Sequence, residues 1–240
     1  MSTSTSERGH AKNVANFETI IISCTGYGSN YNPSNSALTI GNLIVKHEKA
    51  KQQLKTVKIT KEPFDSITGK RQLLFKPLKP YTTRVINSLI AQKAPPSVVK
   101  DARAIARKMS GKRAPGTNKN NSEENQISVS QQSFDKLVDN FDELIVLVQT
   151  EESYNPNEAD LKIEYMQNYL SELSTINTQV KNAANPYSNA LISRNKELYT
   201  PETGLVDLAL EVKNYVKSVF GASSPEYRLI SGIEFSKPRD

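Results

Sequence analysis

Apolar residues recur every three to four positions over several stretches of the chain, which is the spacing of one face of an α-helix. The clearest stretch has its apolar positions at Phe134, Leu137, Val138, Phe141, Leu144, Ile145 and Val148. The same spacing recurs near the start of the chain at Val14, Phe17, Ile21 and Cys24. The pattern therefore predicts a helix in each of these two segments.

Two longer apolar stripes follow these segments. One consists of Ile40, Leu43, His47, Ala50, Leu54 and Val57, and the other of Ile163, Met166, Leu170, Leu173 and Val180. Helices of this length, about 40 Å at 1.5 Å per residue, usually sit in bundles or coiled-coil pairs. Pro63 and Pro186 come after the two stripes. Each proline fits either the first turn of a new helix or a kink in one long helix, and the sequence leaves both options open.

An internal repeat connects these patterns. The triplet Tyr31-Asn32-Pro33 recurs 123 residues later as Tyr154-Asn155-Pro156, and the same shift aligns Pro63 with Pro186 and Arg71 with Arg194. Nine identities fall in positions 31–71, where chance would give about two or three. Before the triplet a shift of 124 residues applies and places Cys24 opposite Val148.

We therefore expect an all-α fold made of two tandem, pseudo-twofold-related helical repeats that form a bundle, with about five helices per repeat. The further helices in each repeat are predicted at 81–91 and from Pro96, and at 204–220 and from Ser224. The predicted order is a flexible N-terminus (1–9), a first repeat (10–113), a polar linker (114–133) and a second repeat (134–240).

Charge is divided unequally between the two repeats. The 240 residues carry a net charge of +6. Residues 10–113 contain 19 Lys/Arg and 5 Asp/Glu, a net charge of +14, whereas residues 134–240 contain 10 and 17, a net charge of −7. Three interpretations follow: the basic repeat contacts the acidic one within or between chains, the basic repeat binds nucleic acid, or the charges only solvate two surfaces.

The candidate phosphate or partner contacts are basic residues on two predicted helices and the tail that follows the second. They are Lys51, Lys55, Lys58, Lys100, Arg103, Arg107, Lys108, Lys112 and Arg113. No helix-turn-helix, RNA-recognition or zinc-finger signature accompanies them, so the nucleic-acid signal is electrostatic only.

The residue types that support familiar catalysis are scarce. One cysteine and two histidines leave no disulfide framework, no zinc cluster and little material for a catalytic triad. Cys24 is interpreted as a core thiol and His47 as a core or interface histidine. No catalytic, cofactor-binding or metal-ligating residue is predicted, and the repeated Arg71 and Arg194 are assigned a structural role.

These observations predict a non-enzymatic helical interaction or assembly protein with a structural role. Its partner would be another protein or a second copy, in a homo-oligomer or filament joined through the basic and acidic halves. The alternative is a nucleic-acid-associated protein that binds phosphates through the first repeat. An enzyme and a membrane-active helical protein are weaker hypotheses. Without a signal-like or membrane-spanning segment, the cytoplasm is the expected compartment, and signal-free export stays open.

Overall fold

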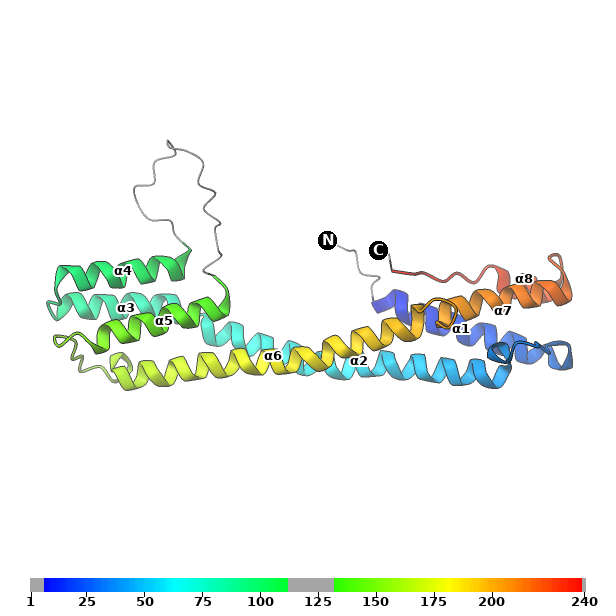
Figure 1. Cartoon of the computed structure of the whole chain (residues 1–240), viewed down its shortest axis with the longest axis horizontal. Helices are drawn as coiled ribbons and strands as arrows, with labels where there is room; N and C mark the ends of the chain where they lie inside the picture. The colour runs from blue at the N-terminus through cyan, green and yellow to red at the C-terminus, as the bar shows by residue number, and fades with distance from the viewer. Residues whose placement is uncertain (1–6, 112–131, 239–240) are drawn as a thin grey trace, which may run out of the picture. The chain divides into compact units, whose positions relative to one another are not determined.

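The computed structural model describes residues 7–111 and 132–238, and within these ranges the chain is helical with no strand (Figure 1). The predicted all-α class is confirmed. The described α-helices are α1 (Glu7–Gly26), α2 (Ile40–Phe75), α3 (Leu78–Ala91), α4 (Pro96–Ser110), α5 (Phe134–Gln149), α6 (Ile163–Tyr199), α7 (Leu205–Phe220) and α8 (Pro225–Ser231). Three short 3-10 helices, η1 (Gly28–Asn30), η2 (Ser36–Leu38) and η3 (Ala159–Leu161), lie in the loops before α2 and α6.

Both long helices continue through their prolines. Pro63 lies inside α2 and Pro186 inside α6. Each half of the described chain therefore has four α-helices, and the expected five per repeat is wrong. An interior proline costs a helix about 3 kcal/mol because it lacks an N–H and crowds the preceding turn. In α2, Val57 before the proline and Phe75 after it are both buried. The helix is therefore packed on both sides of Pro63.

Several helix ends carry the residues that the chemistry of helix termini requires. The Ser133 hydroxyl accepts a hydrogen bond from the Lys136 N–H and caps α5, and Ser224 does the same for Tyr227 at the start of α8. Gly111 ends α4 with a φ of 69°, a left-handed conformation that glycine adopts without steric cost. These local signals fix where the helices begin and end.

The chain divides into two compact units, each of which takes segments from both ends of the sequence. The first unit comprises residues up to Pro63 and from Ala184 onward, which include α1, α7 and α8 (Figure 1). The second comprises Phe64–Ala183, which include α3, α4 and α5. This division follows packing rather than sequence similarity, so it crosses the predicted repeats, and those repeats stay a prediction.

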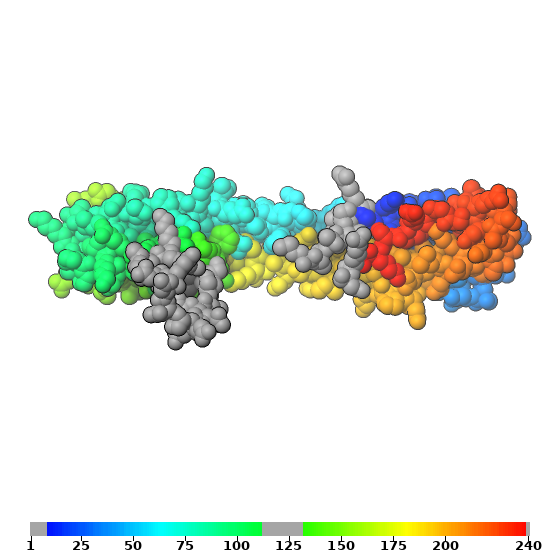
Figure 2. Space-filling view, turned by 90° about the horizontal axis from the view of Figure 1, so that it is seen from above, coloured from blue at the N-terminus to red at the C-terminus, as the bar shows by residue number. Residues whose placement is uncertain are grey.

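The core of the first unit is built by α1 and α7 with the adjoining ends of α2 and α6. Phe17, Ile20 and Cys24 of α1 are almost fully buried, together with Leu205 and Val212 of α7. Figure 2 shows the blue surface of α1 and the orange-red surface of α7 and α8 within this unit. The apolar spacing predicted for the first helix is therefore the face that packs in this core.

The core of the second unit follows the same principle with different helices. Phe141 and Leu144 of α5 are fully buried among Leu89 of α3, Ala102 of α4 and Met166 of α6. The predicted polar linker lies mostly outside the described residues, as do residues 1–6 of the predicted flexible N-terminus. Gln132, at the edge of the linker, donates hydrogen bonds to the carbonyl oxygens of the last turn of α4.

Candidate functional site

The first Tyr-Asn-Pro loop is held by its tyrosine. Tyr31 is buried, and its hydroxyl donates a 2.7 Å hydrogen bond to the carbonyl oxygen of Leu38. The side-chain oxygen of Asn35 accepts a hydrogen bond from the Ala37 N–H and caps η2. The Asn32 N–H donates to the hydroxyl of Tyr215 on α7 at 3.1 Å. A loop of the first half is thus fixed by a side chain of the second half.

The second Tyr-Asn-Pro loop makes the corresponding contacts in the other unit. The buried Tyr154 hydroxyl donates a 2.8 Å hydrogen bond to the carbonyl oxygen of Leu161. The Asn155 N–H donates to the side-chain oxygen of Gln92, directly after α3. A loop of the second half is therefore fixed by a side chain of the first half.

Within the described ranges 7–111 and 132–238, ion pairs join the basic half of the chain to the acidic half. Lys46 pairs with Glu197 at 2.9 Å in the first unit. In the second unit, Arg84 pairs with Asp160 at 2.6 Å, and Lys108 pairs with Glu143 at 3.0 Å. The hydrogen bond from Arg84 lowers the pKa of Asp160 below its ordinary value. In all three pairs the cation comes from residues 10–113 and the anion from residues 134–240.

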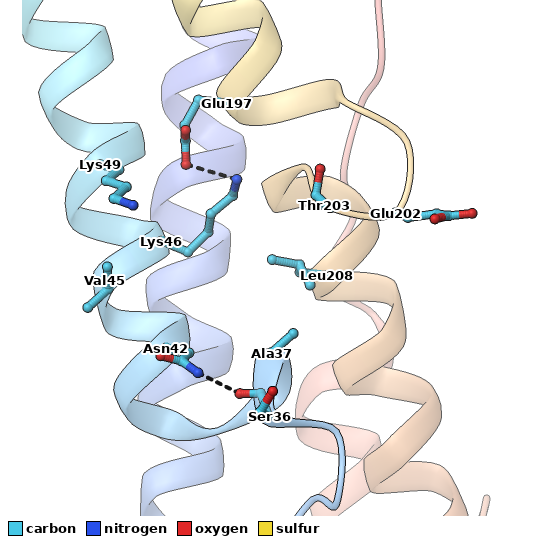
Figure 3. Close-up of a pocket in the computed structure, with 10 residues that line it drawn as sticks. All are labelled: Ser36, Ala37, Asn42, Val45, Lys46, Lys49, Glu197, Glu202, Thr203 and Leu208. Carbon is cyan, nitrogen blue, oxygen red and sulfur yellow. Dashed lines mark hydrogen bonds and ion pairs between the residues drawn. The ribbon is translucent and has the colours of Figure 1, made fainter.

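A groove of about 360 Å³ lies on the first unit, where α2, the end of α6 and the start of α7 meet (Figure 3). Lys46 reaches across it to Glu197, and Asn42 donates a 2.7 Å hydrogen bond to the carbonyl oxygen of Ser36. Lys49 and the apolar side chain of Leu208 also line it. This groove therefore offers ammonium and amide groups beside a small apolar surface.

A second groove, of about 450 Å³, lies on the second unit and has a different lining. Its walls carry tyrosine, proline and leucine side chains with two carboxylates and one guanidinium: Leu74, Pro77, Pro80, Tyr81, Arg84, Asp160, Tyr165, Tyr169 and Glu172. The Tyr81 and Tyr169 hydroxyls donate to the carbonyl oxygens of Asp160 and Leu74. Tyr165 keeps 48% of its surface exposed, so this groove offers an aromatic contact surface.

The predicted phosphate contacts do not form one cluster within a compact unit. Lys51, Lys55 and Lys58 are exposed on the part of α2 that belongs to the first unit. Lys100, Arg103, Arg107 and Lys108 lie on α4 in the second unit, where Lys108 is engaged with Glu143. Lys112 and Arg113 lie outside the described residues.

The repeated arginines contact neighbours in the helical cores. The Arg71 guanidinium lies over the ring of Phe134 at 4.1 Å, a cation–π contact between α2 and α5. Arg194 is buried on α6 and donates hydrogen bonds to the side-chain oxygen of Asn195. The Arg71 contact therefore joins two helices, whereas these hydrogen bonds of Arg194 stay within α6.

Cys24 and His47 are both buried, as the apolar pattern predicts. Burial raises the pKa of the Cys24 thiol to about 12, against an opposing hydrogen bond with Tyr31. The thiol is therefore protonated, and a poor nucleophile, at neutral pH. The Nδ1 atom of His47 lies 3.5 Å from a carboxylate oxygen of Glu48.

One set of functional candidates carries no signal in the sequence pattern. The segment after α8 extends along α1 and α7, and the side chains of Asn13, Asn16 and Lys213 form hydrogen bonds with its backbone. Asn13 and Ser236 are 223 positions apart, so no local periodicity could indicate that they meet. Only the position of Asn13 and Asn16 one helical turn apart suggests a shared surface.

Comparison with known proteins adds no relative to these observations. No protein-family model, no curated protein and no solved structure matches the chain. Among the described residues, no helix is both long enough and apolar enough to cross a membrane. In the same residues, no group of three or more His, Cys, Asp and Glu side chains is placed to hold a metal ion.

Proposed function

We propose that the chain is a non-enzymatic helical interaction and assembly protein whose basic first half and acidic second half are its associating surfaces. The observation that carries this proposal is the set of ion pairs Lys46–Glu197, Arg84–Asp160 and Lys108–Glu143. Each takes its cation from one half and its anion from the other. The contacts that join the halves within one chain can also form between chains, and such a contact builds oligomers or filaments.

The distribution of charge supports this association. Separately, the halves have net charges of +14 and −7. The described part of the first unit (7–63 and 184–238) combines 14 basic with 10 acidic residues, a net charge of +4. The described part of the second (64–111 and 132–183) combines 13 with 12, a net charge of +1. Association of the halves therefore removes most of the self-repulsion that each carries alone.

We further propose that the two halves descend from one duplicated unit. The hydrogen bonds of Tyr31 and Tyr154, each to the carbonyl oxygen seven residues later, support this origin. A second matched pair is the contact between the long helices. Lys46 reaches Glu197 in the first unit and Tyr169 reaches Leu74 in the second. Residues 46 and 169 are 123 positions apart, as are 74 and 197.

The two grooves suggest an inherited interaction surface that has since diverged. At the shift of 123 residues, Lys46 aligns with Tyr169, Lys49 with Glu172, and Asn42 with Tyr165, and all six residues line the grooves. The first groove presents lysines where the second presents aromatic and acidic side chains. Different side chains at matched positions would let the two units take different partners.

Static light scattering at low and high ionic strength tests the assembly proposal. Screening lengths fall from about 30 Å at 10 mM salt to about 3 Å at 1 M, so we expect oligomers at low salt that dissociate as salt rises. The charge reversal Glu143→Lys should weaken association, and the added change Lys108→Glu should restore it as a matched control. A chain that is monomeric at every ionic strength and concentration would end the self-assembly proposal.

A second candidate function is phosphate binding by α2. Lys55 and Lys58 are exposed side by side on this helix, and no ion pair involving either is found among the described residues. Exposed cations on a rigid helix are suited to nucleic-acid phosphates, which are bound without base recognition.

Gel-shift titration with mixed-sequence DNA and RNA tests phosphate binding. The pair Lys55→Glu and Lys58→Glu should weaken binding by roughly tenfold or more at low salt. The pair Lys162→Glu and Lys217→Glu makes the same charge change at exposed positions of the acidic half that are not on α2. This pair should have little effect on binding. Binding that does not distinguish the two pairs, or no binding at low salt, would exclude this candidate.

A further inference from the structure

The last described segment of the chain, Gly232–Pro238, lies along α1 and α7 in the first unit. Figure 2 shows this red segment between the blue surface of α1 and the orange surface of α7. It has no regular secondary structure and follows α8, which has only seven residues. We call it the C-terminal strap.

Most of the polar contacts that hold the strap are made to its backbone. The side-chain amide of Asn13 donates to the Ser236 carbonyl oxygen at 2.7 Å, and its side-chain oxygen accepts from the Ser236 N–H at 3.0 Å. One turn later, Asn16 donates to the Glu234 carbonyl oxygen at 2.7 Å. From the other side, the Lys213 ammonium donates to the carbonyl oxygen of Ile233 in the strap and to that of Ser231 at the end of α8.

Side chains of the strap add two apolar anchors and one ion pair. Ile233 and Phe235 are partly buried against the core of the first unit, and the ammonium of Lys213 lies 5.8 Å from the centre of the Phe235 ring. Lys237 pairs with Asp207 of α7 at 2.5 Å. The surface formed by α1 and α7 is thus a complete docking site for an extended peptide segment.

We propose that this docking site also receives the strap of a second copy, so that two chains exchange straps and form a dimer. The proposal rests on the assembly function above and names one route to it. In the closed form, the strap of a chain lies in the docking site of the same chain. Exchange replaces every contact of the closed form with an identical contact between two chains, so it needs no new complementarity between the copies. Fully extended, the seven residues of the strap reach about 23 Å.

The closed and exchanged forms differ in how they depend on concentration. Within one chain the strap meets its site at a high effective concentration, in the millimolar range for short flexible connections. The exchanged dimer therefore accumulates only at high protein concentration or where other contacts hold two chains together. The contacts of the strap are mainly hydrogen bonds, so exchange should depend less on salt than association through the charged halves does.

A charge swap at the Lys237–Asp207 pair separates the closed form from the exchanged form. A chain with Lys237→Asp places two carboxylates together when it closes on itself, and a chain with Asp207→Lys places two ammonium groups together. When the two full-length variants are mixed, reciprocal exchange restores an opposite-charge pair at both sites. The mixture should therefore form a one-to-one heterodimer, measured by native mass spectrometry, in roughly tenfold excess over either homodimer.

The chain with both substitutions is the matched control. Asp207 also accepts a hydrogen bond from the Glu202 N–H, and the double variant carries the same loss of this bond as Asp207→Lys alone. It restores the pair within one chain and should behave like the unaltered protein. If the unaltered protein self-associates but the mixed variants show no preference for the heterodimer, strap exchange is wrong and the assembly function stands. If the unaltered protein stays monomeric and the mixture forms no heterodimer, both are wrong.

Discussion

Tyr31 and Tyr154 make the same hydrogen bond in different compact units. Each is buried and donates its hydroxyl to the carbonyl oxygen seven residues later, at 2.7 Å in the first loop and 2.8 Å in the second. The hydrogen bond closes each loop over its 3-10 helix and directs the chain into a long helix, α2 or α6. The tyrosines of the two repeated Tyr-Asn-Pro triplets therefore have the same structural role.

Removal of either hydroxyl should cost a similar free energy of unfolding. Tyr31→Phe and Tyr154→Phe each delete one buried hydrogen bond and leave a carbonyl oxygen without its donor, which we expect to cost about 1–2 kcal/mol. Urea unfolding followed by circular dichroism measures both. The exposed Tyr165→Phe is the control and should change stability by less than about 0.5 kcal/mol. A clear loss of stability in only one of the two variants would show that the two hydrogen bonds have different structural roles.

Cys24 should be unreactive in the folded protein. Burial raises the pKa of its thiol to about 12, so almost no thiolate forms at pH 8. We expect iodoacetamide to label Cys24 only when the chain is unfolded in urea, as measured by mass spectrometry. Rapid labelling of the native protein at pH 8 would contradict the assignment of Cys24 to the core.

The protein should lose stability in alkaline solution. Burial raises the pKa of Tyr154 and Tyr169 from 10 to about 12. Between these values the unfolded chain releases the phenolic proton while the folded chain keeps it, so unfolding becomes more favourable as pH rises. Urea unfolding at pH 9, 10 and 11 should show a falling free energy. Tyr154→Phe should make the free energy of unfolding fall less steeply with pH. An unchanged slope would show that the phenol of Tyr154 does not cause the decline.

Gly204 should be sensitive to substitution, although its backbone conformation is ordinary. A Cβ atom at this position would lie 2.6 Å from the carbonyl oxygen of Thr200, closer than real contacts allow. Gly204→Ala should therefore destabilise the connection between α6 and α7 by about 1–3 kcal/mol. Gly69, inside α2, has no atom within 4 Å of such a Cβ, so Gly69→Ala should stabilise the helix by about 0.5–1 kcal/mol. Thermal melting compares the two, and equal effects would contradict this account.

Local sequence patterns predict much of the helical structure, because helices are set by contacts between near neighbours. The three isoleucines at 20–22 illustrate this. Ile20 and Ile21 are buried and Ile22 is 66% exposed, as the rotation of a helix requires. Pro63 shows the limit of local reasoning. Its side chain is compatible with a helix start or an interior position, and packing beyond the proline decides between them.

The sequence also predicts opposite charges on the two halves but not which atoms meet. Lys46 and Glu197 are 151 positions apart, and their contact depends on how the two long helices pack. The strap is less predictable still. Asn13 bonds a backbone N–H and a backbone carbonyl oxygen, and these groups are present at almost every position of any sequence. The amino-acid sequence therefore does not show which backbone groups such a side chain contacts.

Recognition between the two halves is measured most directly by producing residues 1–113 and 114–240 as separate polypeptides and titrating one with the other. Each compact unit needs segments from both, so each half alone should be poorly folded. Mixing should give a one-to-one complex with a gain in helical circular dichroism, a cooperative melt and an affinity that falls as salt rises. Two halves that each fold cooperatively alone and do not bind one another would contradict the proposed association of the basic and acidic halves.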